Sequence, residues 1–274
     1  MNDLLPDRSR LSLNQITVKQ WSLEQAIEGC ARHGIGYISI WRDKLAEQPI
    51  PQTVRQLRDA GIKVSSFCRG GFFSAATVAA RNEKIEDNRR AIEECAAIGS
   101  PVIPLVCGPA HGQSLEEARA TVRDAVAELA PFAKSHGVKL GIEPLHPMYI
   151  ADRSVIVTLQ QAIDIAVQFP SDSVGVVVDT FQTWWDPHVH EEIARAGKRI
   201  CGFHVSDWLV PLPDMLLGRG VMGSGAIDIR SLRQSVERAE YTGPIEVEIF
   251  NKTLWEEDPD KVMQRMIEAY LLHV

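Results

Sequence analysis

Short apolar runs alternate with longer amphipathic runs along the whole chain of 274 residues. The apolar runs have the length of β-strands, and the amphipathic runs repeat apolar residues at helical spacing. We predict strands at residues 11–18, 36–41, 63–68, 102–107, 139–143, 174–179, 200–205 and 245–250. We predict helices at residues 22–33, 51–60, 77–98, 114–136, 159–169, 190–199, 229–239 and 259–272.

Local signals mark the ends of several predicted helices. Ser22 precedes the first helix as a candidate N-cap, and Gly34 follows it as a stop. Ser114 and Glu117 have the spacing of a capping box at the start of a later helix. These signals support the helix boundaries independently of the apolar pattern.

The strict alternation predicts an α/β fold with a parallel sheet and right-handed crossovers. No linker rich in proline, glycine or serine divides the chain, so we expect one domain over residues 1–274. Eight repeating units at this length favour a closed (β/α)8 TIM barrel, and an open doubly wound sheet is the alternative. In such a barrel, chemistry takes place at the C-terminal ends of the strands.

Composition narrows the functional classes. The net charge of −7 argues against nucleic acid or an anionic membrane surface as a partner. The first eight residues lack an apolar core of signal-peptide length, and no apolar run is long enough to span a membrane. The five cysteines form no C-x-x-C pair, which argues against a disulfide framework or a zinc knuckle. We therefore expect a cytoplasmic protein.

Four of the predicted strands end on a residue type that binds hard metal ions: Glu143, Asp179, His204 and Glu248. Alternation along a strand places each of the first three on the face opposite its bulky apolar neighbours and beside a glycine. Bulky residues pack outward against helices, so the polar side chains should point inward. We expect all four to converge in the mouth of the barrel.

Three converging carboxylates would repel one another without a cation. With one imidazole they form a mixed oxygen and nitrogen set that suits Mn²⁺ best, with Mg²⁺, Co²⁺ or Fe²⁺ as alternatives. Glu246 shares a strand face with Glu248 but lies deeper. We take Glu248 as the ligand and expect Glu246 to pair with a buried cation or to form internal hydrogen bonds.

At these residues the chain resembles the xylose isomerase-like TIM barrel superfamily. The resemblance covers essentially the whole chain and is strongest at Glu143-Pro-Leu-His, Asp179-Thr-Phe-Gln, His204-Val-Ser-Asp and Glu248. Members include D-tagatose 3-epimerase, hydroxypyruvate isomerase, inosose dehydratase and the C-glycoside deglycosidases. The resemblance implies that these four residues bind a metal ion. It also implies that Glu143 and Glu248 remove and return a proton next to a carbonyl, through an enediolate that the metal stabilises.

The chain departs from the ketose epimerases at three substrate contacts. Gln182 replaces a histidine, Tyr149 replaces a glutamate and Val210 replaces an arginine. A free ketohexose is therefore in doubt as the substrate.

Other residues near the predicted strand ends are candidates for the catalytic and substrate-binding roles. His146 is a candidate general acid or base. The substrate-binding candidates are Gln182, Trp184, Asp207, Arg219, Trp41 and Arg69. Trp184 and its neighbour Trp185 are candidates for a stacking wall or for a simple cover over the barrel. Arg219 lies in a glycine-rich loop, residues 218–225, which is either an anion-binding loop or a flexible connection.

The leading functional interpretation is a divalent-metal-dependent isomerase or epimerase of a sugar or keto-sugar. The alternative is a lyase that follows the same proton removal with β-elimination, as inosose dehydratase does, or as the C-glycoside deglycosidases do with 3-keto-glucosides. A DNA-repair endonuclease is a third alternative, but it needs more histidines at the strand ends than this chain has. A non-enzymatic binding barrel is the fourth alternative, and its ligand affinity would not depend on a metal ion. The resemblance further implies a homo-oligomer or a complex with a second small subunit.

Overall fold

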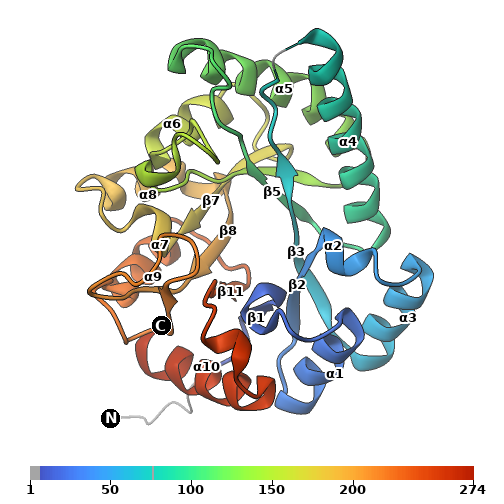
Figure 1. Ribbon diagram of the computed structural model, residues 1–274, viewed down its shortest axis with the longest axis vertical. Coiled ribbons are helices and arrows are strands. Elements are labelled where there is room, and N and C mark those ends of the chain that lie inside the picture. Colours follow the sequence, from blue (N-terminus) through green and yellow to red (C-terminus); the bar gives the residue numbers. More distant parts are fainter. Residues whose placement is uncertain (1–6, 76) are drawn as a thin grey trace.

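The computed structural model describes residues 7–75 and 77–274 (Figure 1). The first six residues, on which part of the signal-peptide prediction depends, lie outside the described part. A parallel sheet with the order β3-β2-β1-β11-β8-β7-β6-β5-β4 forms the centre. Its strands are β1 (Leu11–Asn14), β2 (Tyr37–Trp41), β3 (Lys63–Cys68), β4 (Gly70–Gly71), β5 (Val102–Val106), β6 (Lys139–Ile142), β7 (Val174–Asp179), β8 (Ile200–Val205) and β11 (Ile245–Val247).

The sheet curls into a nearly closed barrel. The strands at the two ends of its order, β3 and β4, follow each other directly in the chain and together occupy the third strand position. Every pair of neighbouring strands in this sheet is parallel. The predicted single-domain (β/α)8 barrel is therefore confirmed, and the open sheet is wrong.

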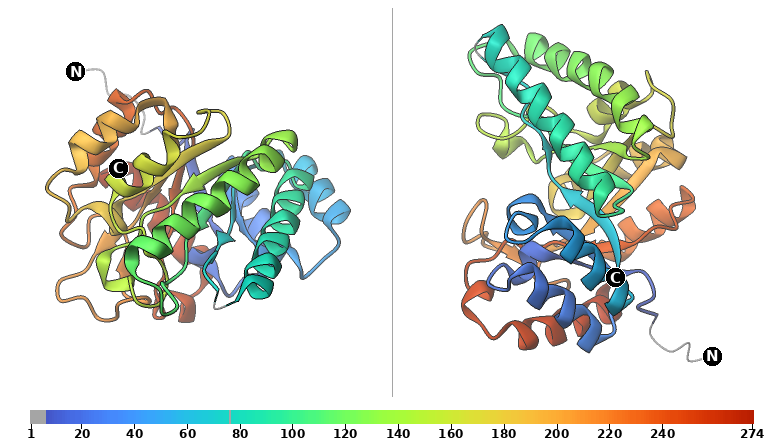
Figure 2. Two further views of the ribbon diagram at one scale, coloured as in Figure 1. Left: turned by 90° about the horizontal axis from the view of Figure 1, so that it is seen from above. Right: turned by 90° about the vertical axis from the view of Figure 1, so that its right-hand side faces the viewer.

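Helices surround the strands on the outside (Figure 1; Figure 2). The long ones are α1 (Leu23–His33), α3 (Ile50–Ala60), α4 (Val78–Ala97), α5 (Leu115–Ser135), α6 (Leu159–Ala166), α8 (Val189–Ala196), α9 (Ile229–Arg238) and α10 (Pro259–His273). Short helices α2 (Arg42–Leu45) and α7 (Thr180–Thr183) follow β2 and β7 directly. Within the described ranges, no helix has both the length and the apolar character needed to cross a membrane.

The predicted helix signals form as expected. Ser22 and Gln25 make a capping box at α1, and Ser114 and Glu117 make one at α5. Gly34 ends α1 with φ 65°, a left-handed conformation that glycine adopts without a steric penalty.

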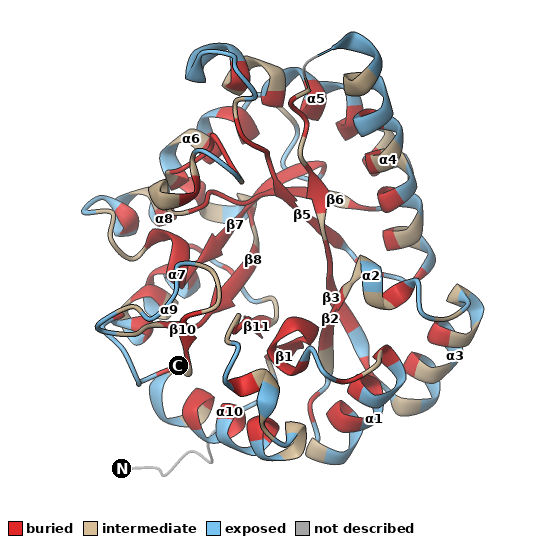
Figure 3. Cartoon of the chain, viewed as in Figure 1, coloured by how far each residue is buried: buried red, intermediate tan, exposed pale blue. Residues whose placement is uncertain are grey.

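The strands are buried, and each helix turns a buried stripe toward them and an exposed face outward (Figure 3). Strands covered on both sides in this way account for the continuous apolar runs of the sequence. Gly175 illustrates how tight this packing is, because a Cβ atom there would overlap the carbonyl oxygen of Arg199.

Two predicted strands are shorter by three or more residues in the structure, and two others, β3 and β8, each contain a bulge. The strand predicted at residues 11–18 ends at Asn14, whose side chain accepts a hydrogen bond from the N–H of Ile16 and starts a 3₁₀ turn, Gln15–Val18. The strand predicted at residues 245–250 is regular only to Val247. In β8 the register shifts at Cys201. The sulfur of Cys201 therefore lies close to Gly141 and Gly175, whereas alternation along a regular strand would point it away from them.

Candidate metal centre and substrate cavity

Four strand ends bring Glu143, Asp179, His204 and Glu248 together. Each residue offers one ligand atom, and these atoms all lie within 4.8 Å of one another. Glu143 directly follows β6, Asp179 ends β7, and Glu248 directly follows β11. His204 lies in β8 in register with Asp179. All four are buried, with at most 6% of the residue exposed.

His204 lies among three carboxylates. Its Nδ1 is 3.3 Å from Oε1 of Glu143 and 3.8 Å from Oε2 of Glu248, and its Nε2 is 3.3 Å from Oε2 of Glu246. Neither ring nitrogen has a well-directed hydrogen bond, although both are buried. Burial alone would lower the pKa of His204, but the negative charges of Glu246, Glu143 and Glu248 raise it well above its usual value.

Glu246 is held behind His204 by hydrogen bonds. Its Oε2 accepts from Nδ2 of Asn14 at 3.4 Å and from Oγ of Ser66 at 3.1 Å. Asn14 also donates to Oε1 of Glu248 at 3.1 Å. The prediction that Glu246 forms internal hydrogen bonds is confirmed. It lies behind the imidazole, in the position from which a carboxylate orients a metal-binding histidine.

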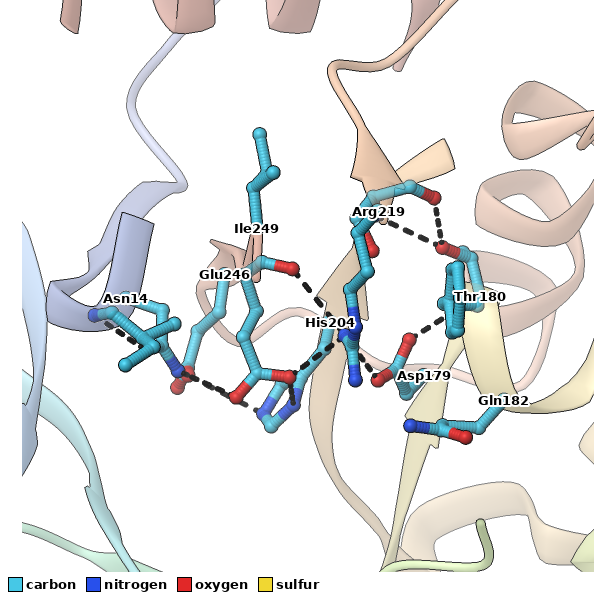
Figure 4. A network of polar contacts seen from close by, with 12 residues as sticks. Asn14, Asp179, Thr180, Gln182, His204, Arg219, Glu246 and Ile249 are labelled. Atoms are coloured by element: carbon cyan, nitrogen blue, oxygen red, sulfur yellow. Dashed lines mark hydrogen bonds and ion pairs between the residues drawn. The ribbon is translucent and has the colours of Figure 1, made fainter. Parts of the chain in front are cut away.

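Arg219 reaches into the same cluster from β10 (Arg219–Gly220), which pairs antiparallel with β9 (Asp207–Trp208). Its Nη1 donates to Oδ2 of Asp179 at 2.9 Å and to Oε2 of Glu248 at 3.0 Å. Figure 4 shows its guanidinium in one polar network with Asp179, His204 and Glu246. Arg219 therefore neutralises two candidate ligands, a role that its prediction as a substrate contact did not include.

The cluster has more buried carboxylates than buried cationic groups, and this charge balance favours binding of a divalent ion. Four carboxylates face two cationic groups, His204 and Arg219. Burial raises the pKa of Asp179, and it raises the pKa of Glu248 to about 7, against the opposing effect of Arg219. Three carboxylates and an imidazole nitrogen without a directed partner fit a hard divalent cation. The ion would be held by Glu143, Asp179, His204 and Glu248.

A cavity of about 540 Å³ opens directly over this cluster. Of the four candidate ligands, Glu143 and Glu248 line it. Four predicted substrate-binding residues also line it: Trp41, Arg69, Gln182 and Arg219. The structure thus brings these four side chains to one cavity with the two glutamates.

The other three predicted site residues do not line this cavity. His146 packs between Trp185 and Trp208, with ring centroids 5.5 and 5.0 Å away. Its Nδ1 accepts a hydrogen bond from the N–H of Met148, and burial lowers its pKa. Trp184 packs against Trp208, with ring centroids 5.5 Å apart, and does not line the cavity.

Asp207 organises a loop in the structure. Its carboxylate is fully buried and accepts hydrogen bonds from four backbone N–H groups. The donors are Trp208, Gly223, Gly225 and Ile227, at 2.8 to 3.1 Å. All four bonds run to backbone N–H groups, so Asp207 holds the predicted glycine-rich loop that carries Arg219.

Three residues of this region were not among the predicted site residues. Asn14 bonds both Glu246 and Glu248, while Tyr149 and Arg153 line the cavity. Asn14 carried a usable signal, since it is a polar residue in an apolar strand near the chain start. Arg153 carried none, because it lies in a loop whose path the apolar pattern does not determine.

Comparisons with known proteins identify relatives that match most of this chain. A family model described as xylose isomerase-like TIM barrel matches residues 27–270. An inosose isomerase of Bacillus licheniformis is 27% identical over 256 residues, which cover 88% of this chain and 89% of that protein. A 3-dehydroshikimate dehydratase of Pseudomonas aeruginosa is 25% identical over 239 residues, which cover 84% of this chain and 36% of that protein.

Solved structures show the same fold. A crystal structure of a protein from Sinorhizobium meliloti 1021 has a TM-score of 0.94 at 41% identity and covers 97% of this chain and 99% of that one. The structure of the IolI protein, which holds a zinc atom, has a TM-score of 0.85 at 23% identity. It covers 97% of this chain and 98% of that one.

Proposed function

The chain belongs to the xylose isomerase-like TIM barrel family, and on that premise we propose that it is a divalent-metal-dependent isomerase or epimerase of a keto-sugar. Its relatives include an inosose isomerase and a 3-dehydroshikimate dehydratase, so it is an enzyme that acts on a sugar-like compound. The proposed reaction moves a proton at the carbon next to a carbonyl group.

One observation carries this proposal. Of the four buried ligand-type residues, Glu143 and Glu248 also line the cavity of about 540 Å³. Two carboxylates beside one substrate are the arrangement needed to remove a proton from one face of a carbon and return it to the other. A bound divalent ion would polarise the carbonyl and make the neighbouring C–H acidic. Mn²⁺ is our first choice, and the zinc atom in the IolI structure shows that a relative of this fold binds a metal.

The environment of Glu248 orients its carboxylate. In the protein without a bound metal ion, burial raises its pKa to about 7. Asn14 and Arg219 donate to different oxygens of this carboxylate and fix its orientation. Trp41 donates from Nε1 to Oδ1 of Asn14 at 2.8 Å and so holds Asn14 in place.

A lyase that uses the same first step is the second candidate. The similarity to a 3-dehydroshikimate dehydratase supports it, because dehydration adds the loss of a neighbouring hydroxyl group to proton removal. The two reactions differ in their products and not in the roles of Glu143 and Glu248.

Proton NMR in D₂O tests both candidates on the metal-loaded protein. Ketoses, inososes and 3-keto-glucosides serve as substrates. We expect deuterium to enter the carbon next to the carbonyl, and Glu143→Gln or Glu248→Gln to stop it. An isomerase releases nothing, whereas a lyase gives an enone that absorbs ultraviolet light. Glu268→Gln, an exposed change on α10, is the matched control. If no compound exchanges deuterium or eliminates while the metal is fully bound, the proposal is wrong.

A further inference from the structure

Four arginines line the substrate cavity: Arg42, Arg69, Arg153 and Arg219. Arg42 and Arg219 each pair closely with two carboxylates, whereas Arg69 and Arg153 do not. The guanidinium of Arg69 lies 4.2 Å from the centre of the Phe72 ring. Within residues 7–75 and 77–274, no acidic side chain forms an ion pair with Arg69, and no hydrogen bond engages its guanidinium. The N–H donors of its guanidinium are therefore available to a ligand in the cavity.

The guanidinium of Arg153 likewise forms few polar contacts. Its guanidinium lies 5.9 Å from the centre of the Tyr149 ring. Its one ion pair among the described residues is to its chain neighbour Asp152, at 3.8 Å, and 65% of the Asp152 side chain is exposed. A long, exposed pair of this kind contributes little. The carbonyl oxygen of Arg153 accepts a hydrogen bond from the N–H of Gly108 at 2.8 Å, which fixes the loop.

The two supporting rings belong to one apolar cluster on the cavity wall. Phe72 packs against the buried residues Val106, Leu145 and Tyr149. Phe72 has φ 54°, a left-handed conformation that is unfavourable for a bulky residue. Its N–H donates to the carbonyl oxygen of Val106 at 2.7 Å and holds it there. The fold thus accepts local backbone strain at the residue that supports Arg69.

Placing two positive charges together in a partly enclosed space is unfavourable. Burial lowers the pKa of Arg69, and the charge of Arg153 lowers it further. A neutral sugar hydroxyl group needs no such pair of charges. An anionic group between the two guanidiniums would relieve the repulsion and take up the free N–H donors.

We propose that Arg69 and Arg153 form an anion subsite of the cavity, and that the substrate carries a carboxylate or phosphate group there. The inference rests on the proposed function only in taking this cavity as the place where the substrate binds. It extends that function from a neutral keto-sugar to a sugar acid or a sugar phosphate.

Calorimetric titration of the metal-loaded protein tests the subsite with three matched probes: D-glucose, D-glucuronate and D-glucose 6-phosphate. One of the charged probes should bind roughly tenfold or more tightly than glucose, because charge-assisted bidentate bonds are strong. The probe that binds identifies the carboxylate or the phosphate as the source. Arg69→Gln and Arg153→Gln should each remove most of that difference, and Arg69→Lys should keep only part of it.

Arg123→Gln is the control, because Arg123 is an exposed arginine of α5 that pairs with its neighbour Asp124. Thermal unfolding and metal content of each variant show that it is folded and loaded. Equal affinity for charged and neutral probes, or equal loss in Arg69→Gln and Arg123→Gln, overturns the subsite. That result leaves the proposed function standing if the metal is bound and deuterium exchange occurs, so the two failures are distinct.

Discussion

Nη1 of Arg219 lies 2.9 Å from Oδ2 of Asp179, and both side chains are buried. The same nitrogen lies 3.0 Å from Oε2 of Glu248. One guanidinium therefore joins two candidate metal ligands that come from different strands. Because Arg219 lies in the hairpin formed by β9 and β10, the pair also ties that hairpin to the mouth of the barrel.

Replacing Arg219 should destabilise the metal-free protein. In Arg219→Gln, two buried carboxylates lose their counter-cation, a change that costs about 3–5 kcal/mol when one partner of a buried pair is removed. Urea unfolding of chelator-treated protein at pH 8 measures the free energy of unfolding. Added Mn²⁺ should restore part of the loss, because a bound ion takes over the charge balance. Arg123→Gln is the control, and an equal effect of the two changes would contradict the assigned role.

Affinity for the metal should rise with pH through neutrality. Burial raises the pKa of Glu248 to about 7, and the surrounding carboxylates raise the pKa of His204 well above its usual value. Both groups then hold protons that a metal ion must displace, so binding weakens as the pH falls below about 7. Calorimetry with Mn²⁺ at pH 5.5 to 8.5, in buffers of different ionisation enthalpy, measures both affinity and protons released. Affinity that does not change over this range would refute the prediction.

The fold and the ligand cluster could be predicted because both depend on local patterns. Alternating strand and helix periods predict the barrel. A polar residue at the end of an apolar strand predicts a side chain in the mouth of that barrel. Glu143, Asp179, His204 and Glu248 each carry this signal within their own segment. The structure brings all four together.

The sequence did not predict the surroundings of side chains whose partners come from distant loops. The bonds of Asp207 run to Gly223, Gly225 and Ile227, which no strand or helix period connects to it. His146 follows Glu143 by three residues, yet the chain turns it toward Trp185 and Trp208. Sequence distance from a strand end therefore predicts a place near the mouth of the barrel but not the direction of a loop side chain.

Asp207→Asn should loosen the loop that carries Arg219. Oδ2 of Asp207 accepts from Gly223 and Gly225, and an amide NH₂ in its place would face two donors. We expect a loss of roughly 1–3 kcal/mol in the free energy of unfolding, the cost of a buried group without a partner. Hydrogen exchange should increase at residues 219–227 before it increases elsewhere. Asp59→Asn, an exposed change on α3, should alter neither measurement.

The variant Glu246→Gln tests whether Glu246 orients His204 or binds the metal ion directly. Its Oε2 lies 3.3 Å from Nε2 of His204, while Nδ1 of the same ring faces Glu143 and Glu248. If Glu246 only holds the imidazole in place, Glu246→Gln should keep one metal per chain and weaken binding by about 10–100-fold.

Asp179→Asn and His204→Asn, in contrast, remove proposed ligands and should leave the dialysed protein largely without metal. Mass-spectrometric metal analysis together with titration of Mn²⁺ distinguishes these outcomes. Loss of metal in Glu246→Gln as complete as that in Asp179→Asn would mean that Glu246 is itself a ligand, and the choice of Glu248 over Glu246 would then be wrong. The distances favour the first result, because the four atoms that lie within 4.8 Å of one another include Glu248 and not Glu246.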